Sequence, residues 1–436
     1  MDRRDFLKST AFISAFGLLG GWEEAFASGC KDASAGKRWG GWKKGHFQIH
    51  FIYTGVAESM FFILPDGTTM LLDCGDFDAL ARGAKAVPLL PGPGRHAGEW
   101  IARYVRRVNP SDKEVDYMML SHYHNDHAGC MTFNAGLEER DGKPYSISGF
   151  GQAAEYLHFG RAIDRCWPDY CDPLPFKEDD KESYPHMKYV YDYLQKHEGL
   201  KIEKFELGAL NQIRMLNDPG RYPDFFIRNI CGNGRLWNED GTVTDLFKEF
   251  FAGKGTEYVN VYENWMSLGM VVGYGPFRFF TAGDLYASWR NPDGVKLCSD
   301  DYLAKVCGKA DVAKLNHHGH YSMKESLVRA LGSRVWVSCV WDQLHNTPDV
   351  MKRLTDRNIY PGDRIVCPGI MPVERRKKAE QAGETWLEDV ADASFEGGHI
   401  VLDVQPGGRR YSITYLSAAD ESMTVRSVMH FNSFEK

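Results

Sequence analysis

The sequence of 436 residues lacks the short motifs that mark several large enzyme classes. It contains no GxSxG, no P-loop and no GxGxxG in a strand-helix-strand frame, so serine-hydrolase, NTPase and dinucleotide chemistry are disfavoured. Its 10 cysteines form no CxxC pair and show no even spacing. We therefore expect mostly buried thiols, with Cys166 and Cys171 as the nearest pair for a disulfide in an oxidising compartment.

Strong charge of either sign is also absent. The formal net charge is −7 at pH 7, and such a mildly acidic chain is a poor electrostatic match to duplex nucleic acid. The one basic run, ERRKKAE at residues 374–380, stands among acidic residues and is predicted to be a solvated helix face. With 43% hydrophobic and 25% charged residues, the composition is typical of a globular enzyme. The 13% aromatic content suits either a heavy core or a pocket lined with stacking surface.

Outside the N-terminal region, no stretch is apolar for long enough to span a membrane, which takes about 20 residues. The opening MDRRDFLKST, followed by an apolar stretch and AFA, resembles a twin-arginine export signal. We therefore expect an export signal over 1–27, a linker over 28–45 and a mature protein in the periplasm or outside the cell. The apolar stretch is too short for a permanent membrane anchor, and a lipid anchor at Cys30 is the lesser alternative.

Alternating and apolar segments predict β-strands from residue 46 onward. HFQIHFIYTG alternates, SMFFILP is apolar, and TTMLLDCGD follows a DG turn. Apolar residues have helical spacing over 97–108, and VDYMMLS then predicts a short buried strand. Further on, WMSLGMVVGYGPFRFFTAGD predicts a hairpin that ends at Asp284, and GHIVLDVQPGGRRYSITYL predicts a closing hairpin over 398–416.

Strands in both halves of the chain, each followed by helices, predict an α/β fold built as a four-layer αββα sandwich. We expect this domain to cover 46–420, with a C-terminal tail over 421–436. The stretch 131–257 has mixed character without repeats, and we interpret it as a long insertion over the active site.

The stretch MLSHYHNDHAGC concentrates three histidines and an aspartate at the end of a predicted buried strand. In a tight loop, His122 and His124 can face one metal ion while Asp126 and His127 face another. Imidazole nitrogen suits zinc or iron, and a carboxylate suits a harder or shared ion. The pattern therefore predicts a two-metal site within one loop, with a solvent-exposed polar turn as the disfavoured alternative.

Two distant segments supply the remaining side chains of the ligand type. FFTAGDL ends an apolar segment at Asp284, and VAKLNHHG ends another at His317 and His318. Asp284 can bridge both ions through its two oxygens, and a cap or turn residue after the strand is the alternative. Either His317 or His318 completes the second ion, with His317 preferred and the other histidine left for substrate or supporting contacts.

In this order, IHFIYTGVAESMFFILPDGTTMLLDCGD, LSHYHNDHAG, ENWMSLGMVVGYGPFRFFTAGDL and AKLNHHGH resemble the sequence blocks of the metallo-β-lactamase superfamily. The branch that they resemble most is that of the competence-protein-type metallohydrolases, the hydrolase domain of DNA-uptake channel proteins. The resemblance implies two metal ions that share one carboxylate, with these ligands: His122 and His124 for the first, Asp126 and His127 for the second, Asp284 for both, and His317 or His318 for the second.

Many members of the superfamily have one more histidine on the first ion. No pattern places it here, and the candidates from the 131–257 stretch are His158, His186 and His197. The competence-type branch often lacks this ligand, so the resemblance allows one ion or two. His50 and His399 lie on predicted strands and are expected to be structural.

The segment VWDQLHNTPDVMKRL resembles the part of this branch in which a histidine near a proline opens a helix. The resemblance implies that His345 binds substrate or protonates the leaving group, with a plain helix-start residue as the alternative. Asp126 and His345 are therefore the predicted catalytic residues. His320 and Tyr321, close in sequence to the ligand segment, are expected to face the pocket.

A pair of metal ions about 3.5–4 Å apart lowers the pKa of a bridging water, so that hydroxide is available near neutral pH. We therefore expect an exported metal-dependent hydrolase with two zinc ions, or manganese or iron in their place. Phosphoester bonds of a small or medium-sized substrate are the first expectation, and lactone, carboxylic-ester or amide bonds are the alternative. A protein that binds metal without catalysis is the alternative from another class. Tight binding of duplex nucleic acid is not expected, and the oligomeric state stays open.

Overall fold

The computed structural model describes residues 34–77, 80–130, 145–173, 183–250, 262–290, 294 and 296–434, all within the unit formed by residues 31–436. The predicted export signal over 1–27 and Cys30 lie outside the described residues. Within the described ranges, no helix is both long enough and apolar enough to cross a membrane.

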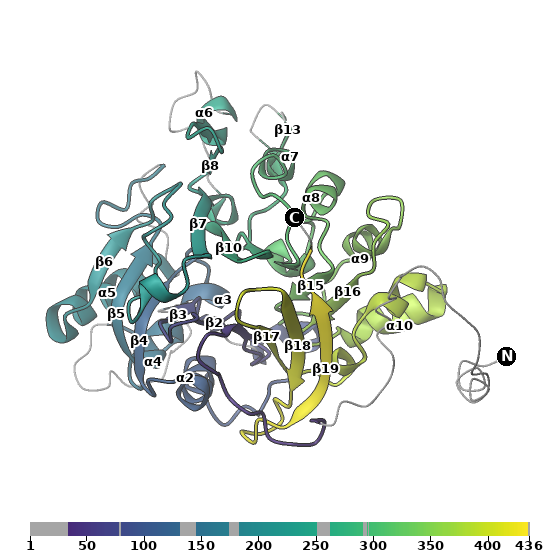
Figure 1. Ribbon diagram of the computed structural model, residues 1–436, viewed down its shortest axis with the longest axis horizontal. Helices are drawn as coiled ribbons and strands as arrows, with labels where there is room; N and C mark the ends of the chain where they lie inside the picture. Colours follow the sequence, from purple (N-terminus) through teal and green to yellow (C-terminus); the bar gives the residue numbers. More distant parts are fainter. Residues whose placement is uncertain are drawn as a thin grey trace. The chain divides into compact units, whose positions relative to one another are not determined.

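Two large β-sheets form the centre of this unit (Figure 1). The strands of the first sheet are β1 (Phe47–Phe51), β2 (Met60–Ile63), β3 (Thr69–Leu72), β4 (Glu114–Met119), β5 (His158–Asp164), β6 (Lys201–Lys204), β17 (His399–Val404), β18 (Arg410–Leu416) and β19 (Val425–Asn432). The strands of the second are β7 (Phe225–Gly232), β8 (Arg235–Trp237), β9 (Val243–Asp245), β10 (Gly269–Tyr274), β11 (Phe277–Thr281), β14 (Val312–Lys314), β15 (Val335–Ser338) and β16 (Ile365–Pro368). In space the first sheet runs β19-β18-β17-β1-β2-β3-β4-β5-β6, and the second runs β16-β15-β14-β11-β10-β7-β8-β9.

Helices cover the outer face of each sheet, so the predicted four-layer αββα sandwich is confirmed. The helices on the first sheet are α2 (Ala97–Val108), α4 (Gly149–Ala153) and α5 (Ser183–Glu198). Those on the second are α7 (Ser299–Leu303), α8 (Glu325–Leu331), α9 (Pro348–Thr355) and α10 (Val373–Ala382). Further elements are α3 (Asn125–Ala128), α6 (Leu246–Phe250) and a ribbon of β12 (Ser288–Arg290) with β13 (Lys296–Cys298).

Alternation along the strands divides the apolar side chains between two kinds of core. In β2, Met60 and Phe62 belong to the cluster between the sheets, whereas Phe61 and Ile63 belong to the cluster under the helices. Successive residues of a strand point to opposite faces, which produces this division. Between the sheets, the ring of Phe62 lies 6.2 Å from the ring of Phe279 in β11, in an edge-to-face arrangement that attracts aromatic pairs.

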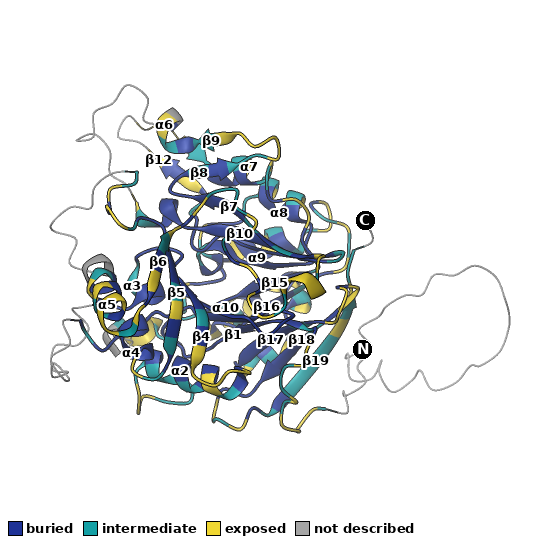
Figure 2. Cartoon of the chain, turned by 60° about the vertical axis from the view of Figure 1, so that its left-hand side comes forward, coloured by how far each residue is buried: buried dark blue, intermediate teal, exposed yellow. Residues whose placement is uncertain are grey.

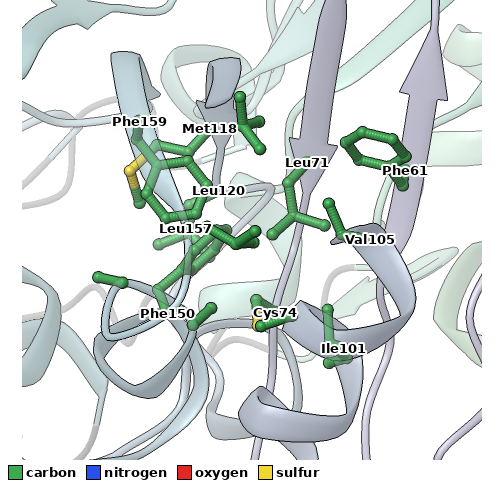
Figure 3. Close-up of a cluster of buried hydrophobic side chains, with 14 of the residues drawn as sticks. Phe61, Leu71, Cys74, Ile101, Val105, Met118, Leu120, Phe150, Leu157 and Phe159 are labelled. Carbon is green, nitrogen blue, oxygen red and sulfur yellow. The ribbon is translucent and has the colours of Figure 1, made fainter. Parts of the chain in front are cut away.

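Helix α2 shows how an outer layer forms, and it confirms the helix predicted over 97–108. Ile101 and Val105 are four residues apart, so both lie on the same face of the helix. Figure 3 shows this face against Phe61 and Leu71 of the first sheet, within one buried apolar cluster. The same division occurs in α5: Figure 2 shows one side of this helix exposed, and Met187, Val190 and Leu194 belong to the buried cluster under the first sheet's helices.

The described parts of the stretch 131–257 are built into both sheets. β5 and β6 extend the first sheet beyond β4, and β7, β8 and β9 extend the second sheet beyond β10. The predicted hairpins are confirmed as β10–β11 and β17–β18. The predicted tail over 421–436 contains an additional strand, because β19 pairs along β18 at the edge of the first sheet.

Most of the described cysteines are buried, as predicted. Cys166 and Cys171 are both thiols and do not form a disulfide with each other. Burial raises the pKa of the Cys166 thiol to about 11, so it stays protonated and poorly reactive near neutral pH.

Strand direction brings the predicted site residues to one end of the sandwich. β11, β14, β15 and β16 run parallel to one another, so their carboxyl ends meet at the same edge of the second sheet. β3 and β4 are also parallel in the first sheet. The 122–127 loop follows β4, Asp284 follows β11, and His317 and His318 follow β14.

Asp300 is a buried carboxyl group in α7. Its Oδ2 accepts a hydrogen bond from the backbone N–H of Lys324, 2.7 Å away, just before α8. Burial raises the pKa of Asp300 from 3.8 to about 7, so the folded chain keeps a proton that the unfolded chain releases. The free energy of unfolding therefore falls as the pH rises through this interval, and the full loss is present above about pH 7.

We expect Asp300→Asn to remove this pH dependence, because the amide keeps the acceptor oxygen and cannot ionise. The melting temperature of the variant, relative to that of the unmodified chain, should rise between about pH 5 and about pH 8. Thermal unfolding followed by circular dichroism measures the difference, with Asp240→Asn on an exposed turn as the control. A difference that stays constant over this pH range would contradict the assignment.

Candidate metal centre

Asp73, just after β3, holds the loop that follows β4 through hydrogen bonds. Its carboxylate accepts hydrogen bonds from the backbone N–H and the hydroxyl of Ser121, both 2.7 Å away. Its Oδ2 also accepts a hydrogen bond from Nδ1 of His127, at 2.8 Å. Gly75 must lack a side chain here, because a Cβ would lie 1.9 Å from the carbonyl carbon of Asp126. These contacts hold the predicted ligand loop in one conformation.

Asp284 and His318 reach the same place from the second sheet. Asp284 follows β11, and its backbone N–H donates to Oγ of Ser267 at 3.2 Å. His318 lies in the short 3-10 turn Asn316–Gly319 after β14, and its Nδ1 donates to the carbonyl of Cys339 at 2.8 Å. The side chains of Asp284 and His318 are both buried.

Two imidazole nitrogens and two carboxylate oxygens converge at this point. Nε2 of His318 lies 2.9 Å from Oδ2 of Asp284 and 3.1 Å from Oδ2 of Asp126. Nε2 of His127 lies 3.2 Å from the same Asp284 oxygen and 3.3 Å from the same Asp126 oxygen. The structure thus brings together one complete set of the side chains predicted for the second metal ion.

The chemistry of these four atoms fits a divalent cation. The Nδ1 atoms of His127 and His318 bond outward to Asp73 and Cys339, so each Nε2 faces the two carboxylate oxygens, where a bound cation would replace the Nε2 proton. Nε2 of His127 has no hydrogen-bond partner in the part of the chain that the structure describes. Two nitrogens and two carboxylate oxygens match the number and type of ligands that zinc takes in proteins.

The pKa shifts of the four groups also indicate that the site attracts positive charge. Burial disfavours the charged form of each of the four groups. For His127 and His318, the charges of Asp284 and Asp126 outweigh burial and raise both pKa values. For Asp284 and Asp126, the two histidines outweigh burial and lower both pKa values. The carboxylates therefore stay ionised and attract a cation, whether a proton or a metal ion.

A buried ion pair lies behind His318. Oε2 of Glu58 is 3.2 Å from Nδ1 of His318, and its Oε1 is 2.8 Å from Nζ of Lys314. The Lys314 ammonium also donates to the carbonyl of Gly283 at 2.8 Å and lies 3.7 Å from Oδ1 of Asp284. Because Glu58 and Lys314 are fully buried, their charges act at short range without screening by water. They orient His318 and balance the charge of Asp284.

Glu58 also qualifies as a cation-binding group by distance alone. One ligand-type atom from each of Glu58, His127, Asp284 and His318 lies within 4.8 Å of the others. Glu58 meets His318 at Nδ1, however, which is the nitrogen that faces away from the four converging atoms. Asp126 instead meets both Nε2 atoms, so by geometry it is the stronger candidate for a ligand, and Glu58 lies on the outer side of His318.

The predicted first ion has a smaller ligand set. Nε2 of His122 lies 3.1 Å from Nδ1 of His124, and the His122 ring lies 4.2 Å from the ring of His127. The three histidines considered as a further ligand have other partners: Glu114 for His158, the Ser148 carbonyl for His186, and the Tyr193 ring for His197. Among the described residues, a first ion would therefore depend on His122, His124 and the shared Asp284.

The structure distinguishes the two histidines that follow β14. His317, the preferred ligand in the sequence interpretation, donates from Nδ1 to the carbonyl of His320 at 2.6 Å, and its ring meets that of Tyr286 edge-on at 5.1 Å. His318 instead meets the two carboxylates described above. Both residues have positive φ, 48° and 53°, and this tight backbone turn sends the two adjacent side chains in different directions.

His345, a predicted catalytic residue, lies beside the ligands. Its ring stacks on that of His318, with centroids 4.6 Å apart and 8° between the planes. The backbone N–H of Trp341 donates to its Nδ1 at 3.4 Å, so the proton of the neutral ring resides on Nε2. Burial and the neighbouring histidines lower the pKa of His345 well below its usual value. The ring is thus placed as a neutral hydrogen-bond donor, whereas Asp126, the other predicted catalytic residue, lies among the ligands.

Sequence reasoning missed three charged residues that support the site: Asp73, Glu58 and Lys314. Each stands at or near the end of an apolar run, in LLD, AES and VAK, where a buried charge requires a partner. A charged residue next to an apolar run indicates a buried charge. The sequence does not identify its partner, because these residues meet only in the folded chain.

Residues 53–132 match the family model described as Metallo-beta-lactamase superfamily. The matched stretch contains β2, β3, α2, β4 and the loop with the four clustered ligand-type residues. Together with the sandwich architecture, the match shows a metallo-β-lactamase fold. No curated protein matched the chain. Among solved structures, the chain is similar to Zn(2+)-bound PqqB from Methylobacterium extorquens, at 10% identity and a TM-score of 0.28, over 70% of this chain and 93% of that one.

We expect His318→Ala to lower the affinity for Zn²⁺ by at least about 100-fold, because it removes one of the four converging atoms. The matched control is His317→Ala, which leaves these atoms in place and should change the affinity by less than about threefold. Competition with a chromogenic chelator measures both values. An equal loss in the two variants, or a greater loss in His317→Ala, would contradict the ligand assignment.

The Glu58–Lys314 pair predicts strongly coupled variants. Lys314→Met should lower the free energy of unfolding by about 3–5 kcal/mol, because it leaves the Glu58 carboxylate buried without its partner. The double variant Glu58→Gln/Lys314→Met should lose clearly less than the sum of the two single variants. Chemical unfolding of the four proteins measures this coupling. Additive losses would show that the pair does not act as a unit.

Proposed function

We propose that this chain is an exported metal-dependent hydrolase that cleaves phosphoester bonds. The observation that carries the proposal is the convergence of Nε2 of His127 and His318 on Oδ2 of Asp126 and Asp284. The match to the metallo-β-lactamase superfamily supports the same class of activity. Export is supported by the twin-arginine pattern at the N-terminus.

The side chains around the centre have different roles in the proposed hydrolysis. Bound zinc supplies a Lewis acid that polarises the substrate and lowers the pKa of water to about 7. Hydrogen bonds from Nδ1 to Asp73 and to the Cys339 carbonyl fix the orientation of His127 and His318, and Glu58 places a negative charge 3.2 Å from Nδ1 of His318. His345 offers an Nε2–H beside His318, and this group can donate a hydrogen bond to the leaving-group oxygen.

A positive charge on the backbone segment of His345 favours an anionic substrate such as a phosphoester. Arg375 of α10 donates from Nη2 to the carbonyl of Leu344 at 2.6 Å and from Nε to the carbonyl of His345 at 3.4 Å. These contacts hold the guanidinium over the segment that carries His345. Arginine keeps its charge throughout the physiological pH range. The resemblance to the competence-type branch also supports phosphoester hydrolysis.

Protein purified without chelator should contain about one or two zinc ions per chain, measured by plasma mass spectrometry. After loading with Zn²⁺ or Mn²⁺, it should hydrolyse bis-p-nitrophenyl phosphate, and removal of the metal with EDTA should abolish this activity. We expect Asp284→Asn to lower kcat/KM by at least about 100-fold, because the amide lacks the charge that holds the cation.

Two controls make this test specific. Asp240→Asn makes the same chemical change on an exposed turn and should leave kcat/KM unchanged. A panel of lactones and carboxylic esters is assayed in parallel. Hydrolysis of this panel alone would contradict the phosphoester proposal, and full activity of Asp284→Asn with metal bound would contradict the site. Cell fractionation tests export.

A further inference from the structure

A continuous row of aromatic rings borders the metal centre. Six side chains form this row, which we call the aromatic belt: His124, Tyr262, Tyr286, His317, His320 and Tyr321. The ring centroids of successive members lie 6.1, 6.2, 5.1, 5.3 and 4.3 Å apart. The belt begins in the ligand loop after β4 and ends in the segment after β14, so it links the two stretches that carry the ligand histidines.

The belt is far more exposed than the ligands that it borders. Tyr262 is 50% exposed and Tyr321 is 53% exposed, and Tyr286 between them is half-buried. His127 and His318, by contrast, are almost fully buried. Exposed tyrosine rings contribute little to the core, but their faces and hydroxyl groups provide a surface on which a ligand can stack.

Buried neighbours hold the belt in place. The Tyr262 ring lies 6.2 Å from that of Trp265, which stacks on the fully buried Trp289 at 4.6 Å with 9° between the planes. His317 is fixed by its hydrogen bond to the carbonyl of His320. A surface that is already ordered loses little conformational entropy on binding, so it suits recognition of a rigid group.

We propose that the aromatic belt binds the planar ring of the substrate, which is then an aryl or nucleoside phosphoester. This assignment rests on the proposed function and names its substrate class. The ring stacks on the belt tyrosines, while the anionic phosphate lies toward the ligand histidines and toward Arg375, which is held by the carbonyls of Leu344 and His345. Water adds to phosphorus, the P–O bond to the ring-bearing group breaks, and that group leaves with one of the protons of the water.

Binding of phosphonates that cannot be hydrolysed tests the belt without requiring turnover. Phenylphosphonate and methylphosphonate share the anionic group, and only the first carries a planar ring. We expect the zinc-loaded protein to bind phenylphosphonate at least about tenfold more tightly, because stacking on an aromatic side chain adds favourable free energy. Isothermal titration calorimetry measures both affinities.

Variants of the belt isolate the contribution of its rings. Tyr262→Leu/Tyr321→Leu should reduce the preference for phenylphosphonate to within about twofold, while the affinity for methylphosphonate and the zinc content stay unchanged. Tyr262→Phe/Tyr321→Phe keeps both rings and should keep the preference. Tyr189→Leu, which removes an exposed tyrosine from α5, is the control at a distant sequence position.

The possible failures separate the two proposals. If the zinc-loaded protein binds neither phosphonate and hydrolyses no phosphoester, the proposed function is wrong and the belt assignment fails with it. If it binds both phosphonates equally, or if the leucine variant keeps the preference for the ring, only the belt assignment is overturned. Circular dichroism of each variant establishes that it is folded.

Discussion

The centre depends on one electrostatic constraint: two carboxylates, Asp126 and Asp284, lie in the interior with their oxygens facing the Nε2 atoms of two histidines. Burial of charge is costly unless an opposite charge lies close by. The hydrogen bonds at the Nδ1 atoms turn the Nε2 atoms toward the two carboxylates, where a bound metal ion would replace their protons. A divalent cation held at this point would satisfy all four atoms at once.

The surrounding side chains extend the same balance of charge outward. Asp73 accepts a hydrogen bond from Nδ1 of His127, and Glu58 lies 3.2 Å from Nδ1 of His318. Lys314 then neutralises Glu58 and lies near Asp284, so negative and positive groups alternate through the buried region. Asp73 and Lys314 lie at the carboxyl ends of β3 and β14, and Glu58 lies just before β2. This arrangement explains how polar side chains at the end of an apolar sandwich can be both buried and well oriented.

Short-range patterns predicted the parts that depend on them. Apolar periodicity gave α2 and the hairpins, and the HxHxDH spacing marked the ligand loop, because each of these features is encoded within a few residues. Which of His317 and His318 faces the carboxylates depends on two successive positive φ angles, which no spacing rule specifies. The roles of Glu58 and Lys314 depend on contacts between distant parts of the chain. The strands within 131–257 were missed because no clear alternation marks them, and they join the two sheets through β4 and β10, which lie outside the segment.

The ligands come from both halves of the sandwich: the loop with Asp126 and His127 follows a strand of the first sheet, and Asp284 and His318 follow strands of the second. A cation held by all four side chains would link the two sheets. Docking of the sheets and uptake of the ion would then be thermodynamically linked, since the site is complete only when the sheets are in register. The side chains that would hold the ion would therefore also stabilise the packing of one sheet on the other.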